Sequence, residues 1–204
     1  LLKANDPWFA PTDVTLGPDG AVYLADWHDA RTAHPDPDAT WDRSNGRIYR
    51  IQKAGAERAA TFDLAAESNA QLLGRLDCEN DWFARWARRL LAERENLDIA
   101  PELRRRIFAE PNTPRAVDAL WTLYACGGFD AELAAELLAH PNDTVRGWAV
   151  RFLGESGVVA PNLASQLVTM ARQETSPWLV SQLASVCQRL PAKDAVQMAA
   201  ALAL

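Results

Sequence analysis

Asn142–Leu153 reads NDTVRGWAVRFL and Asn80–Leu91 reads NDWFARWARRLL, so the two stretches align without a gap. They are offset by 62 residues, or two repeats of about 31 residues each. Related stretches begin at Asn112 and at Ser176. Apolar residues recur at helical spacing in each stretch, and each opens with a residue type that caps helix N-termini. The chain from residue 80 onward therefore consists of four repeats of a helical unit.

A second, shorter helical run follows each of the four openings. These runs cover residues 101–110, 130–139, 161–172 and 192–202. Helix pairs that repeat with a period in the thirties are typical of α-solenoids. The pattern D-x-V-R-x-x-A-x-x-x-L that begins at Asp143 resembles a HEAT repeat. We therefore predict a mainly α chain, in which residues 80–204 form a HEAT-like α-solenoid of about four helix pairs. Its interior is expected to include Trp86, Ala149, Phe152 and Leu153.

The chain before residue 64 has a different period. Val14 and Leu16 alternate with Thr15, a Pro-Asp-Gly turn follows, and further apolar runs cover residues 21–27 and 47–52. This pattern predicts a small antiparallel meander of three strands. Because a lone meander of this size is barely stable in water, we expect it to belong to a larger sheet. Residues 64–79 are expected to link the two parts.

The loop at residues 28–45 concentrates polar side chains between two predicted strands. Loops of this length are usually functional or disordered. In one interpretation His28, Arg31 and His34 face a substrate as acid–base groups or ligands, and Asp26, Trp27 and Arg47 line a cofactor. In a second interpretation hard oxygen ligands bind calcium, and the candidates are Asp36, Asp38 and Asp42.

The third interpretation is structural. Aspartate side chains would cap turns, and arginines would pair with carboxylates. Asp26 ends one strand and Arg47 begins the next, so we expect these two side chains to pair across the base of the loop. The sequence leaves all three interpretations open.

Composition excludes several classes of function. The net charge of −6 argues against a nucleic-acid binder, which needs a basic surface. The three cysteines are widely spaced and form no C-x-x-C motif, so we expect no zinc ribbon or haem attachment. No apolar run is long enough for a membrane span. The chain begins without Met and ends in an apolar helical run, so we expect it to be a fragment of a longer protein.

Residues 13–51 resemble the closing part of the propeller in the membrane-bound dehydrogenase-like proteins of Planctomycetes and Verrucomicrobia. The matching features are Asp13-Val14, the turn at residues 17–20, YLADW at residues 23–27 and GRIYRI at residues 46–51. In that family a propeller similar to glucose/sorbosone dehydrogenases is followed by HEAT-like repeats, and often by a c-type cytochrome domain. The resemblance implies that residues 1–63 are a partial propeller blade.

The resemblance also implies an exported or periplasmic parent, a sugar or alcohol oxidoreductase with pyrroloquinoline quinone and c-type haem. The fragment lacks the other blades and a C-x-x-C-H motif, so we expect no cofactor within it and no catalysis by it alone. Its expected role is propeller closure and helical scaffold. Its expected partners are the other blades, a downstream cytochrome domain and a protein on the solenoid. The alternative function is a non-catalytic protein- or carbohydrate-binding module.

Overall fold

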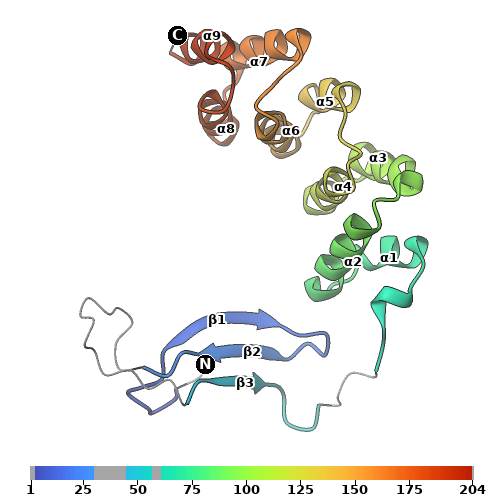
Figure 1. Ribbon diagram of the computed structural model, residues 1–204, viewed down its shortest axis with the longest axis vertical. Helices are drawn as coiled ribbons and strands as arrows, with labels where there is room; N and C mark the ends of the chain where they lie inside the picture. The colour runs from blue at the N-terminus through green and yellow to red at the C-terminus, as the bar shows by residue number, and fades with distance from the viewer. Residues whose placement is uncertain (1–2, 30–44, 57–60, 204) are drawn as a thin grey trace. The chain divides into compact units, whose positions relative to one another are not determined.

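The structure is a computed structural model that describes residues 3–29, 45–56 and 61–203. These residues form a mainly helical chain with a small antiparallel sheet near its N-terminus (Figure 1). The chain divides into two compact units, residues 1–66 with 78–86, and residues 67–77 with 87–204. Helix α2 (Asp81–Arg94) therefore contributes its first residues to one unit and the rest to the other.

The predicted meander is confirmed. Its antiparallel strands lie in the order β1 (Pro11–Leu16), β2 (Val22–Asp26) and β3 (Arg47–Ile51). The turn between β1 and β2 is closed by the amide of Gly20, which donates to the carbonyl of Gly17 at 3.0 Å. Gly20 has a φ of 72°, a conformation that favours glycine. A Cβ atom at Gly17 would lie 2.3 Å from the ring of Tyr23, so this turn also requires a residue without a side chain.

One face of the sheet is apolar and largely uncovered. Val14 lies opposite Leu24, and Val22 lies between Leu16 on one side and Ile51 on the other. Directly opposed residues share a face, so these five side chains form one surface, the apolar sheet face. Leu24 at its centre is buried, whereas Val14 is 63% exposed, Leu16 42% and Ile51 38%. The sheet thus presents its hydrophobic side to solvent.

The sheet's other face carries a polar contact between β3 and the first turn. Arg50 Nε donates to Asp19 Oδ2 at 2.8 Å. This hydrogen bond from the Arg50 guanidinium lowers the pKa of Asp19. In the same unit, Asn80 Nδ2 donates to the carbonyl of Gly17 at 2.9 Å, which connects the residue preceding α2 to the turn.

The segment expected as a linker is folded. It contains a 3-10 turn (Leu64–Ala66) and helix α1 (Asn69–Arg75). Ser68 caps α1 through a capping box with Gln71. Leu72, Leu73 and Leu76 belong to the hydrophobic core of the second unit, so residues 67–77 are part of the helical unit.

The remaining helices follow the predicted boundaries closely. They are α3 (Ala100–Ala109), α4 (Thr113–Ala125), α5 (Ala131–Leu138), α6 (Asp143–Glu155), α7 (Pro161–Gln173), α8 (Pro177–Cys187) and α9 (Ala192–Leu202). A 3-10 turn, Leu97–Ile99, precedes α3. Three of the predicted openings are helix N-caps, namely Asn112, Asn142 and Ser176. Two capping side chains, those of Asn112 and Asn142, accept hydrogen bonds from backbone amides of the first turn.

The helices of the second unit lie in two rows, as Figure 1 shows for α4 to α9. Helix α6 packs between α4 and α8, and α7 packs between α5 and α9. The rows enclose a continuous leucine-rich core, in which Ala149, Phe152 and Leu153 are buried as predicted. The prediction for Trp86 was wrong, since 38% of this residue is exposed. Its ring instead contacts that of Trp82 at the start of α2, at a centroid distance of 5.7 Å.

Candidate functional site

His28 lies buried at the start of the loop between β2 and β3, and it closes the base of that loop. Its Nε2 lies 3.2 Å from the side-chain amide nitrogen, Nδ2, of Asn45, at the other end of the loop. A side-chain amide nitrogen only donates, so Nε2 accepts this hydrogen bond in the tautomer that carries its proton on Nδ1. The ring stacks on Trp8 at a centroid distance of 6.0 Å. His28 has a φ of 54°, so a left-handed backbone conformation directs its ring into this position.

Asp26 is the second buried polar residue at the loop base. Its Oδ1 accepts hydrogen bonds from the backbone amides of Ala10, at 3.0 Å, and of His28, at 2.9 Å. Its Oδ2 faces His28 Nδ1 across 3.7 Å, which is too long for a hydrogen bond. Within the described residues these two atoms have no hydrogen-bond partner. The carboxylate therefore connects the N-terminal segment, the end of β2 and the histidine.

The expected ion pair between Asp26 and Arg47 is not formed. The backbone register does place the two residues opposite each other on β2 and β3. The Asp26 carboxylate, however, is fully buried and already bound by two amides, whereas Arg47 is exposed. Local amides thus bind Oδ1 of Asp26, whereas pairing with Arg47 would require the ordering of a long side chain, which costs entropy.

Of the other sequence candidates, the structure describes only Trp27 and Arg47. Trp27 is exposed beside the buried pair. The remaining candidates lie outside the described residues: Arg31, His34, Asp36, Asp38 and Asp42. In the part of the chain that the structure describes, no three metal-ligating side chains come together.

Sequence reasoning missed two members of the loop base, Trp8 and Asn45. Trp8 comes from the segment before β1, and no local pattern connects it to His28. Asn45 is the last residue of the loop, so its position was a usable signal. Asp29, which directly follows His28, is also buried. Within the described residues, Asp26 Oδ1 and His28 Nε2 are each held by neighbouring groups of the protein.

Residues 1–55 match the model of DUF7133, a domain family of unknown function. The DUF7133 match covers all three strands and both ends of the loop, and it covers none of the helices. No curated protein and no solved structure matches the chain. Among the described residues, no helix is both long and apolar enough to cross a membrane.

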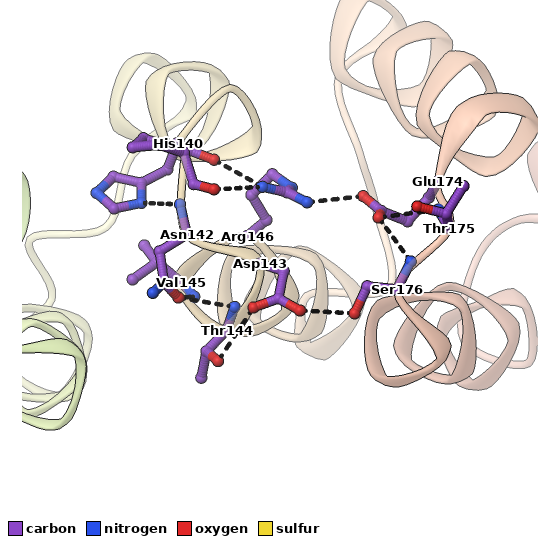
Figure 2. Close-up of polar contacts among 10 residues, drawn as sticks. His140, Asn142, Asp143, Thr144, Val145, Arg146, Glu174, Thr175 and Ser176 are labelled. Atoms are coloured by element: carbon purple, nitrogen blue, oxygen red, sulfur yellow. Dashed lines mark hydrogen bonds and ion pairs between the residues drawn. The ribbon is translucent and has the colours of Figure 1, made fainter.

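A second polar site connects neighbouring helices of the second unit (Figure 2). Asn142 caps α6 and also donates from Nδ2 to Thr113 Oγ1 of α4 at 2.7 Å. Asp143 Oδ2 accepts from the hydroxyl of Ser176, which precedes α8, at 2.6 Å. This hydrogen bond lowers the pKa of Asp143. The N-termini of α4, α6 and α8 are thus joined by residues at their N-cap or first helical positions, an arrangement we call the cap ladder.

Arg146 extends the cap ladder to the turns that precede α6 and α8 (Figure 2). Its Nη1 donates to the carbonyls of His140 and Pro141, at 2.9 and 3.0 Å, and its Nη2 to Glu174 Oε2 at 2.9 Å. Burial alone would raise the pKa of Glu174, but hydrogen bonds from the Ser176 amide and Arg146 outweigh it, and the pKa falls below its usual value. The chemistry of this ladder is structural, because the charges of Asp143, Arg146 and Glu174 are each bound within the protein.

Proposed function

We propose that this chain joins the closing sheet of a β-propeller to a HEAT-like α-solenoid in an exported dehydrogenase-like protein. Its own role would be structural. The observation that carries the proposal is the apolar sheet face, where Val14, Leu16 and Ile51 are exposed. Exposed contiguous apolar surface marks a site of association, and a neighbouring propeller blade would cover it with a complementary apolar face.

The two rows of helices and the cap ladder support the solenoid part of the proposal. In such arrays each repeat contacts only its neighbours, and stability comes from the interfaces between repeats. Here Asn142, the N-cap of α6, binds Thr113 of α4, and Asp143, the first residue of α6, binds Ser176 before α8. A rigid array of this kind suits a scaffold that holds a propeller against a further domain or a protein partner.

We expect the cofactors that the resemblance implies to lie outside this chain. A c-type haem requires C-x-x-C-H, and the sequence contains no such motif. Within the described residues, Asp26 and His28 are directed at each other, and Arg47 is exposed and apart from them. A quinone or haem would therefore be held by other parts of the parent protein.

Dye reduction tests this function. The full-length protein, supplied with pyrroloquinoline quinone and a panel of sugars and alcohols, is expected to reduce an artificial electron acceptor. The 204-residue chain under the same conditions is expected to show none. Turnover by the chain alone would contradict a structural role. Absence of turnover in the full-length protein would contradict the dehydrogenase assignment.

The alternative is a non-catalytic protein-binding module. A groove between α5 and α7, which is lined by ten residues of the helical unit, favours this second function. A full-length protein without turnover that still binds a polypeptide would support it.

A further inference from the structure

The groove between α5 and α7 has the composition of a binding site. Its volume is about 440 Å³, within the range of about 300–1,000 Å³ that is typical of ligand pockets. Ala135, Leu138 and Met170 supply apolar atoms to its lining. Helix α5 has only 8 residues, whereas α7 has 13, so α5 covers α7 along part of its length. The groove lies entirely within the second unit.

The rim of the groove on α7 is polar and uncharged. It carries Ser165, Gln166, Thr169 and Gln173. The Ser165 hydroxyl donates to the carbonyl of Pro161 and the Thr169 hydroxyl to that of Ser165, at 2.9 and 3.0 Å, so both are left as acceptors. In the described part of the chain, no hydrogen bond holds the side-chain amides of Gln166 and Gln173. Each amide can both donate to and accept from a ligand.

The two charged residues of the groove neutralise each other. Arg146 and Glu174 form an ion pair of 2.9 Å, and both side chains are mostly buried. Arg146 also donates to two backbone carbonyls, so its guanidinium is not available to an anion. A neutral groove with an apolar floor complements an uncharged ligand, because burying an unpaired charge there would be costly.

The spacing of the two glutamines fits an extended peptide. They are separated by seven residues of helix, or about 10 Å at 1.5 Å per residue. An extended chain covers this length in about three residues. We propose that the groove binds a three-residue, uncharged segment of a partner polypeptide. Its central aliphatic side chain lies between α5 and α7, and its backbone amides hydrogen-bond to Gln166 and Gln173.

The two methionines of the chain provide the assay. Met170 lines the groove, whereas Met198 is fully buried and lies outside it, so ¹³C-methyl methionine NMR gives one reporter and one internal control. The probe is the capped peptide acetyl-Gly-Leu-Gly-amide, and the comparison peptide carries Asp in place of Leu. We expect a saturable shift of the Met170 methyl signal with the leucine peptide, and at least tenfold weaker binding of the aspartate peptide.

Variants separate the groove from general effects. The double variant Gln166→Ala and Gln173→Ala is expected to weaken binding by about tenfold, as loss of two hydrogen bonds would. Arg172→Ala, next to Gln173 but outside the groove lining, is the matched control and is expected to bind normally. The Met198 signal verifies that each variant is folded.

Four results would overturn the proposal. They are no shift of Met170, equal shifts of both methionines, equal binding of the two peptides, and a Met170 shift that follows protein concentration alone, which would indicate a second copy as the occupant.

Discussion

Asp26→Ala should selectively loosen the sheet. The substitution removes the acceptor of two buried backbone amides, those of Ala10 and His28. An unsatisfied buried donor costs about 1–3 kcal/mol, so the two together cost about 2–4 kcal/mol once partial hydration is allowed for. Asp26→Asn is the matched control, because its amide oxygen can keep both hydrogen bonds. We expect the asparagine variant to lose less than about 1.5 kcal/mol.

Amide hydrogen exchange is the appropriate assay, because the chain has two units and need not unfold in one step. A loss of about 2–4 kcal/mol corresponds to about 30- to 700-fold faster exchange of the amides in β1 and β2. Amides of α4 to α8 should exchange at unchanged rates. The reasoning is refuted if Asp26→Ala and Asp26→Asn have the same effect, since the hydrogen bonds of Oδ1 would then contribute nothing.

Three further predictions concern the helical unit. Ala149→Asp should destabilise the helical unit by about 3–5 kcal/mol in urea unfolding, because an unpaired charge would be buried. Ala131 is exposed, so Ala131→Asp should change stability by less than about 0.5 kcal/mol. Similar losses for both variants would contradict the assignment of the core. A double-mutant cycle on Asp143 and Ser176 should give a coupling energy of about 1 kcal/mol, and a value near zero would show that the cap ladder contributes nothing. Hydrogen bonds from two arginines lower the pKa of Glu102 to about 2 from 4.5. The contribution of Glu102 to stability should therefore be present above pH 4.5 and be lost as the pH falls towards 2. Urea midpoints measured between about pH 6 and 2 should fall less steeply in Glu102→Gln than in the unmodified chain, and identical slopes would count against this carboxylate.

The helices were predictable because their signals are local. Asn112, Asn142 and Ser176 cap helices and precede regular apolar spacing, and the helix boundaries followed within one or two residues. Helix α1 carried an equally local signal, the capping box of Ser68 and Gln71, which the expectation of a linker overlooked. The exposure of Trp86 was missed, since its repeat position matched that of the more buried Trp148.

The loop base was predictable only in part. Strand register followed from alternation and correctly placed Asp26 opposite Arg47. The hydrogen-bond partners of Asp26 could not be predicted from the sequence, because they include the backbone amide of Ala10, which is 16 residues away. The position of the His28 ring depends on a left-handed backbone and on Trp8, neither of which has a sequence signature.

The central claim is that the apolar sheet face is an interface, and hydrogen exchange of the sheet tests it most directly. The amides of β1 and β3 are compared in the 204-residue chain and in the full-length protein, with α6 amides as the internal reference. Covering this face should slow exchange at the sheet by at least about tenfold and leave α6 unchanged. Equal exchange rates of the sheet amides in the two proteins would contradict the claim.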